Sequence, residues 1–224
     1  MASAAALGFD VYGTLVDPLA ISAELRRFVG DDADRVAQLW RTKQLEYTWR
    51  RSLMGIYAPF SVCTAQALDF ATRSLGHQLA PGVSASLIEM YRRLPAFPEA
   101  AGGLDRIRGA GHRMVAFSNG EADMVHAVLA NAALSPMLED IVSVDEVKIY
   151  KPAPSVYGHL AARMGTALKD TWLVSSNPFD VIGAKAAGLR AAWVRRNPRA
   201  ILDPWEIEPD LIVSDLNELS ERLV

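Results

Sequence analysis

The sequence has a single cysteine, Cys63, so no disulfide bond can form within the chain. Such a protein suits a reducing compartment, and we therefore expect a cytoplasmic location. Long apolar runs are also absent, and none approaches the roughly 20 residues that a membrane-spanning helix needs. Basic residues are not in excess, since 23 Lys and Arg stand against 26 Asp and Glu. We therefore expect neither a membrane nor a nucleic acid as a partner.

The composition is that of an ordinary globular protein. Half of the 224 residues are hydrophobic and 22% are charged. This length is long for one simple domain and short for two full ones, so a core domain with a smaller insertion fits best.

The chain begins with a β pattern and then turns helical for about eighty residues. The apolar run Leu7-Gly8-Phe9 stops at Asp10, and Gly13-Thr14 follow, as expected where a buried parallel strand ends in a turn. Apolar residues then recur every three or four positions, which predicts four helices, over 21–29, 34–51, 61–75 and 82–94.

The remainder of the chain alternates between strand and helix patterns. This alternation predicts an α/β fold with a parallel sheet covered by helices on both faces. The predicted strands are 113–117, 141–143, 171–174, 190–194 and 211–213, and the predicted helices are 104–108, 122–132, 155–164, 179–187 and 216–223.

Polar residues recur where the predicted strands end. Each has an ordinary structural explanation: a serine can cap a helix, an asparagine can form a turn, and a lysine is usually solvated. Because parallel strands end at one edge of the sheet, we nevertheless expect these side chains to converge there. They are Asp10, Ser118, Asn119, Lys151, Ser175, Asn177 and Asp180.

Four short motifs resemble, in order, those of the haloacid dehalogenase superfamily. They are Phe9-Asp10-x-Tyr12-Gly13-Thr14-Leu15, Ser118-Asn119-Gly120, Lys151-Pro152 and Ser175-Ser176-Asn177-x-x-Asp180. The resemblance covers essentially the whole chain. It implies a Rossmann-like core formed by residues 1–16 and 99–224, with a helical cap, residues 17–98, inserted after the first strand.

The residues at two positions argue against the assignment of this chain to the phosphatases of this superfamily. Phosphatases carry a second Asp two residues after the nucleophile and an acidic Mg²⁺ ligand in the last motif, where this chain has Tyr12 and Ser176. A hard cation prefers several oxygen ligands, and Asp10 and Asp180 beside Lys151 offer too little negative charge. We therefore expect no metal and no cofactor.

The chain instead resembles the L-2-haloacid dehalogenase branch. The run from Leu39 to Trp49 resembles the first cap helix of that branch, in which Arg41 would bind the halide. Without the resemblance, Arg41, Arg50 and Arg51 could not be told apart. The resemblance also implies a pocket for the alkyl group, with Phe179 where many relatives have Trp. The pocket residues are Val11, Tyr12, Leu45, Phe60 and Phe179.

The implied reaction hydrolyses a short L-2-haloalkanoate to a D-2-hydroxy acid. Asp10 would attack C2 and form an ester, which water would then cleave. Lys151 would keep Asp10 ionised, Ser118 and the N–H groups of Tyr12 and Asn119 would bind the substrate carboxylate, and Arg41 would stabilise the halide. The residues expected to orient groups around Asp10 or to act on the water are Thr14, Tyr157, Ser175, Asn177 and Asp180.

Three other functions stay open at this point. The chain could be a Mg²⁺-dependent phosphatase, a hydrolase of another carbon–heteroatom bond, or a catalytically silent binding protein that uses its cap. A homodimer is a further implication of the family, and Trp40 and Trp49 are compatible with an apolar interface.

Overall fold

The computed structural model describes residues 4–223 and contains a sheet of six parallel strands in the order β3-β2-β1-β4-β5-β6. Strand β1 lies at the centre, where Leu7 pairs with Met114 on one side and Trp172 on the other. Its four residues are all buried, as expected for a strand covered on both faces. The strands are β1 (Ala6–Phe9), β2 (Arg113–Ser118), β3 (Asp140–Ser143), β4 (Thr171–Ser175), β5 (Arg190–Val194) and β6 (Leu211–Val213).

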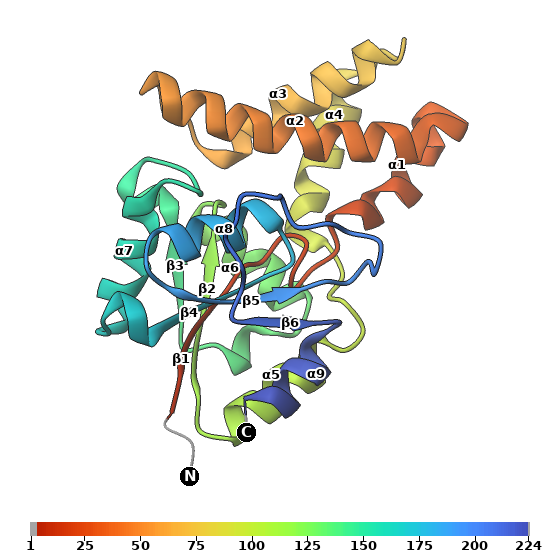
Figure 1. The fold of residues 1–224 in the computed structure, drawn as a ribbon. Helices are drawn as coiled ribbons and strands as arrows, with labels where there is room; N and C mark the ends of the chain where they lie inside the picture. The colour runs from red at the N-terminus through yellow and green to blue at the C-terminus, as the bar shows by residue number, and fades with distance from the viewer. Residues whose placement is uncertain (1–3, 224) are drawn as a thin grey trace.

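Helices cover both faces of this sheet (Figure 1). Helices α5 and α9 pack together on one side, and α7 and α8 pack together on the other. The parallel crossovers between strands require this arrangement. The helices of the core are α5 (Ala100–Gly109), α6 (Ala122–Asn131), α7 (Pro154–Met164), α8 (Pro178–Ala186) and α9 (Leu216–Arg222).

Four helices between β1 and α5 form a separate layer above the carboxyl edge of the sheet (Figure 1). We call them the cap helices: α1 (Ser22–Val29), α2 (Ala33–Met54), α3 (Phe60–Ser74) and α4 (Pro81–Met90). Helices α2 and α3 pack along each other, and the indole of Trp40 on α2 donates a hydrogen bond of 2.8 Å to the Thr64 carbonyl on α3. Trp40 is fully buried there, so it is not available to an interface between subunits.

The two chain segments that join the cap helices to the core run side by side. Val16 and Ala96 form an antiparallel bridge. The Asp17 N–H donates to the Pro95 carbonyl at 3.0 Å, and the Phe97 N–H donates to the Leu15 carbonyl at the same distance. This pairing fixes both connections close to the turn that follows Asp10.

Every predicted strand and helix is present, with ends that differ by only a few residues from the predicted ones. Cys63 is buried, in agreement with its interpretation as a small apolar residue. None of the helices within residues 4–223 combines the length and the apolar character that crossing a membrane requires.

Candidate active site

Asp10 stands at the point where β1 ends, and its two carboxylate oxygens have different surroundings. Oδ2 accepts hydrogen bonds from the Thr14 hydroxyl at 2.8 Å, the Asn177 amide at 2.7 Å and the Ser175 hydroxyl at 3.3 Å. Oδ1 accepts a hydrogen bond from the Lys151 ammonium at 3.2 Å. Three donors saturate the lone pairs of Oδ2, whereas Oδ1 keeps one available. The geometry therefore marks Oδ1 as the more nucleophilic oxygen.

Lys151 lies between two carboxylates. Its ammonium is 3.2 Å from Asp10 and 2.8 Å from Asp180, and its third hydrogen bond goes to the Phe117 carbonyl at 2.9 Å. The side chain is only 1% exposed. Lys151 thus lies beside Asp10, where we expected the polar residues of the strand ends to converge, and it is not solvated as a lysine usually is. All three ammonium donors are used, which orients the charge toward both acids.

Asp180 is completely buried in the first turn of α8. Its Oδ1 accepts a hydrogen bond of 2.8 Å from the Tyr157 hydroxyl. Burial raises the pKa of the Asp180 carboxyl above its usual value, and the adjacent Lys151 ammonium opposes that rise. Burial likewise raises the pKa of Tyr157, so this phenol stays protonated and acts as a hydrogen-bond donor.

Arg41 reaches the site from cap helix α2. Its guanidinium donates to the backbone carbonyl of Tyr12 at 3.0 Å and to the side-chain carbonyl of Gln44 at 2.9 Å. The other two arginines of this helix behave differently: Arg50 pairs with Glu46, and Arg51 donates to Gln66 at 2.9 Å. The structure therefore selects Arg41 as the arginine of the site.

Apolar side chains from both layers close the site around these charged groups. The Tyr12 ring lies 5.6 Å from the Phe60 ring, and the enclosed cavity has a volume of about 10 Å³, room for about one water molecule. The lining residues are Asp10, Tyr12, Arg41, Leu45, Phe60, Ser118, Asn119, Lys151, Asn177 and Phe179.

The candidate donors for an anionic ligand face this cavity. Ser118 is buried, and its hydroxyl oxygen accepts a hydrogen bond of 3.1 Å from the Gly120 N–H. Among the described residues, the backbone N–H groups of Tyr12 and Asn119 find no acceptor. Val11 differs from expectation, because its side chain is buried away from the cavity while its carbonyl accepts the N–H groups of the following turn. The other predicted residues line the cavity or bond to residues that do, except Tyr157, which bonds to Asp180 behind Lys151.

The carboxylates of the site do not form a metal-binding cluster. Within residues 4–223, no three His, Cys, Asp or Glu side chains are grouped closely enough to hold a metal ion. Tyr12 and Ser176 occupy the two positions where a phosphatase would carry further acids. Burial raises the pKa of Tyr12, so its phenol is neutral and supplies no anionic ligand.

Among the hydrogen bonds that join residues 17–98 to the rest of the chain beside the site, two involve carboxylates that no sequence motif singled out. The Tyr57 hydroxyl donates to Asp145 at 2.6 Å, and the Ser61 hydroxyl donates to Glu121 at 2.5 Å. Gln44 and Arg196 are two further residues that no sequence motif singled out. Arg196 donates to the Thr14 carbonyl at 2.6 Å and pairs with Glu99 at 2.7 Å, so it supports the turn that holds Asp10.

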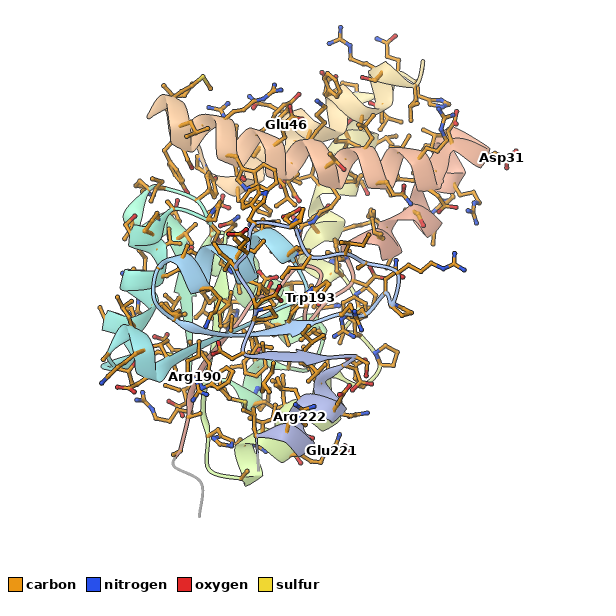
Figure 2. The ribbon with its side chains drawn as sticks, viewed as in Figure 1. Asp31, Glu46, Arg190, Trp193, Glu221 and Arg222 are labelled. Carbon is orange, nitrogen blue, oxygen red and sulfur yellow. The ribbon has the colours of Figure 1, made fainter. Side chains whose placement is uncertain are left out.

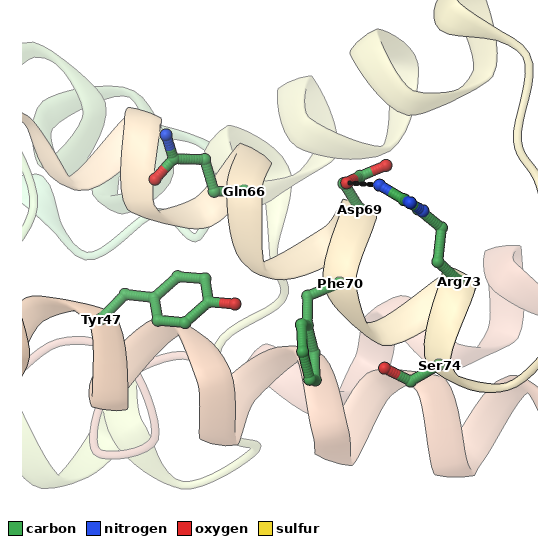
Figure 3. A pocket seen from close by; sticks show the side chains of 6 residues that line it. All are labelled: Tyr47, Gln66, Asp69, Phe70, Arg73 and Ser74. Carbon is green, nitrogen blue, oxygen red and sulfur yellow. Dashed lines mark hydrogen bonds and ion pairs between the residues drawn. The ribbon is translucent and has the colours of Figure 1, made fainter.

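A larger hollow lies on the outer side of the cap helices and is a different kind of surface. It measures about 580 Å³ and runs between α2 and α3 (Figure 3). Its charged groups, Asp69 and Arg73, are paired at 3.3 Å, and both are exposed. Without a buried acid or nucleophile, this hollow lacks the groups that the Asp10 site brings together. Its lining residues are Tyr47, Gln66, Asp69, Phe70, Arg73 and Ser74.

Comparisons with known proteins agree in both sequence and structure. A family model described as haloacid dehalogenase-like hydrolase matches residues 4–188. The chain is 38% identical over 188 residues to (S)-2-haloacid dehalogenase 1 of Pseudomonas sp. (strain CBS-3), covering 84% of this chain and 83% of that one. It is 38% identical over 192 residues to haloacetate dehalogenase H-2 of Moraxella sp. (strain B), covering 85% of each.

Among solved structures, a similar one is the L-2-haloacid dehalogenase from Xanthobacter autotrophicus with chloropropionic acid covalently bound. The two chains superpose with a TM-score of 0.90 at 32% identity, and the match covers 97% of each.

Proposed function

Because this chain belongs to the haloacid dehalogenase-like hydrolases, and specifically resembles their (S)-2-haloacid dehalogenases over most of its length, we propose that it hydrolyses the carbon–halogen bond of short L-2-haloalkanoates. The enzyme is a hydrolase acting on carbon–halide bonds, and its products are a D-2-hydroxy acid and a halide ion. The observation that carries the proposal is the pair of opposed groups, the buried Asp10 carboxylate on the core and the Arg41 guanidinium on the cap helices.

The substrate is an anion that must approach the Asp10 carboxylate. Two like charges 4 Å apart repel by about 4 kcal/mol at an effective dielectric constant of about 20. The Ser118 hydroxyl and the N–H groups of Tyr12 and Asn119 bind the substrate carboxylate and offset this repulsion. They face the cavity and have no other acceptor within the described residues. Lys151 adds a positive charge 3.2 Å from Asp10.

Asp10 Oδ1 attacks C2 of the substrate opposite the halogen. The new O–C2 bond forms as the C2–halogen bond breaks, the bonding pair leaves with the halide, and the centre inverts. Arg41 stabilises the negative charge that grows on the leaving halide, which is a charge of the transition state more than of the substrate. Tyr12, Leu45, Phe60 and Phe179 exclude water from the reacting atoms.

Water then attacks the carboxyl carbon of Asp10, and the bond from this carbon to Oδ1 breaks. Oδ1 leaves on C2 as the hydroxyl of the 2-hydroxy acid and takes one proton of the water, and the other proton is released as Asp10 returns to a carboxylate. In the ester, Oδ2 is the carbonyl oxygen, and it takes negative charge as the tetrahedral intermediate forms. The donors from Thr14, Ser175 and Asn177 already point at this oxygen at 2.7–3.3 Å, as an oxyanion hole requires. Asp180, fixed by Tyr157, holds Lys151 in place.

The cap helices are part of this mechanism. We assign residues 17–98 to a cap domain and residues 1–16 and 99–224 to a catalytic core, a division supported by the paired connections at Asp17–Pro95 and Leu15–Phe97. A cavity of about 10 Å³ is too small for a haloacid, so the substrate enters when the cap moves away from the core. The Tyr57–Asp145 and Ser61–Glu121 bonds break in that motion.

The cytoplasm is the proposed location, in line with the single cysteine. A homodimer is proposed through the end of α2, where Leu53, Met54 and Ile56 are exposed apolar residues. Light scattering coupled to gel filtration, with Leu53→Asp as the disrupting variant, tests this assembly.

Halide release from L- and D-2-chloropropionate in excess EDTA tests the proposed function. We expect release from the L form alone and the same rate with and without EDTA. No halide release, together with hydrolysis of a phosphate ester on adding Mg²⁺, would replace the proposal with the phosphatase. Absence of both halide release and phosphate ester hydrolysis would favour another carbon–heteroatom substrate or a binding protein.

A further inference from the structure

Gln44 is a completely buried amide on the same helix face as Arg41, and it lies beside the Tyr91 phenol. Its side-chain carbonyl accepts a hydrogen bond from Arg41 at 2.9 Å, and its NH₂ group donates to the Thr64 hydroxyl on α3 at 2.6 Å. Thr64 in turn donates to the Phe60 carbonyl at 2.8 Å. Arginine is only a donor, and the Thr64 hydrogen is already used, so this orientation of the amide is the one that satisfies every partner.

The partners of Arg41 are both neutral. They are the Gln44 amide and the Tyr12 backbone carbonyl, and within residues 4–223 Arg41 forms no ion pair with an acid. Acids are available on this helix, because Glu46 is five residues after Arg41 on α2 (Figure 2). Glu46 lies on another face, where it pairs with Lys43 at 2.6 Å and with Arg50. Arg41 is therefore held in place while its charge stays uncompensated.

From this arrangement we infer that Gln44 is a positioning residue for dehalogenation: it aims the Arg41 guanidinium at the departing halide and preserves its full charge. This inference rests on the proposed function, because it requires that Arg41 stabilise a leaving halide. Holding a charged donor with neutral acceptors gives it a fixed direction before the halide charge develops, which is the condition for electrostatic stabilisation of a transition state. A carboxylate at position 44 would fix the direction equally well but would neutralise the charge.

The deciding variants are therefore Gln44→Glu and Gln44→Leu. The first keeps the size and the acceptor for Arg41 but adds a negative charge and removes the NH₂ donor to Thr64. The second removes both the acceptor and the donor. A matched control is Thr48→Val, since Thr48 is also buried on α2 and its hydroxyl bonds only to the Leu45 carbonyl at 2.6 Å. Thr64→Val is a third test variant, because it removes the acceptor of the Gln44 NH₂ group without changing residue 44.

The measurement is the single-turnover rate of halide release from L-2-chloropropionate and from L-2-bromopropionate. Chloride is the poorer leaving group and needs more stabilisation, so the loss should be larger for the chloro compound. For Gln44→Glu we expect a fall of about ten- to hundred-fold with chloride and a clearly smaller fall with bromide. The added carboxylate neutralises part of the Arg41 charge, which should cost less than the roughly 10²–10³-fold loss on removing a transition-state donor. Gln44→Leu and Thr64→Val should shift the ratio of the two rates in the same direction, and Thr48→Val should leave it unchanged.

Adding Gln44→Glu to an Arg41→Lys background should cost much less than adding it to the unaltered protein, because the group that it positions is already gone. Equal losses with both halides, or full additivity with Arg41→Lys, would overturn the role of Gln44 and leave the proposed function standing. Absence of halide release from the unaltered protein would instead overturn the proposed function, and this inference with it.

Discussion

Replacing Lys151 by Met would leave two buried carboxylates without a cation. The side chains have nearly the same length, so the main change is the loss of the ammonium, which is 3.2 Å from Asp10 and 2.8 Å from Asp180. At an effective dielectric constant of about 20, each pair contributes about 5–6 kcal/mol of Coulomb attraction before desolvation is subtracted. Because removing one partner of a buried pair leaves an uncompensated charge, we expect the free energy of unfolding at pH 7 to fall by about 3–5 kcal/mol.

The loss of stability in Lys151→Met should depend on pH, and the protonation of the buried carboxylates decides the direction of that dependence. Without Lys151 the pKa of Asp180, already raised by burial, has no opposing cation and rises further. The folded variant then binds a proton that the unfolded chain gives up, so its stability falls as the pH rises and recovers as the pH drops. Urea unfolding at pH 5 and at pH 8 measures this difference.

A second variant separates charge from packing. In Lys151→Met/Asp180→Asn one of the two buried charges is removed, so the double variant should be more stable at pH 8 than Lys151→Met alone. A loss in Lys151→Met that is the same at both pH values, or a double variant that is still less stable, would refute the electrostatic reasoning. Activity should be absent from both variants.

Three further predictions concern other parts of the site. Arg41→Ala should slow halide release by about 10²–10³-fold, measured in a single turnover, and an unchanged rate would mean that another group stabilises the halide. Burial raises the pKa of Asp180, and only the ionised Asp180 can pair with Lys151. On acidification, the rate of halide release should therefore begin to fall at a pH above the usual pKa of an aspartate. A fall confined to lower pH would contradict the role of Asp180. Arg196→Met should lower the free energy of unfolding by about 3 kcal/mol because Glu99 loses its partner, and Arg196→Met/Glu99→Gln should recover part of that loss in the same urea titration.

The elements of the fold could be predicted from the sequence because each carries a clear apolar pattern. The strand from Arg113 to Ser118 carries the short unbroken apolar run of a strand buried on both faces. After a turn, the apolar residues of the helix from Ala122 to Asn131 recur with helical spacing. The convergence of Asp10, Ser118 and Ser175 followed from the parallel order alone, since each lies at or just beyond a strand end.

The environment of each side chain was harder to predict, because it depends on contacts between distant segments. Lys151 lies 141 positions from Asp10, and only the folded chain shows that it is buried rather than solvated. Family resemblance could single out Arg41 among three arginines. Its hydrogen bonds to Tyr12 and Gln44 depend on how the helices pack and could not be predicted from the sequence. Arg196 belongs to no motif, and no periodicity points to its contact with Thr14.

The core and the cap helices contribute different groups to the site. The core supplies the nucleophile and the donors around Oδ2, and the cap helices supply Arg41 and part of the apolar wall. Residues of both layers therefore line the site, and the structure leaves room for only about one water molecule beside Asp10.

The most direct test of the account is the path of the water oxygen. A single turnover of L-2-chloropropionate with enzyme in excess, in water labelled with ¹⁸O, should place the label in the Asp10 carboxylate and leave the lactate unlabelled. Mass spectrometry of the peptide that contains Asp10 and of the released lactate gives both readings. Label in the lactate of the first turnover, with none in Asp10, would show that water attacks C2 directly and would contradict the ester on Asp10.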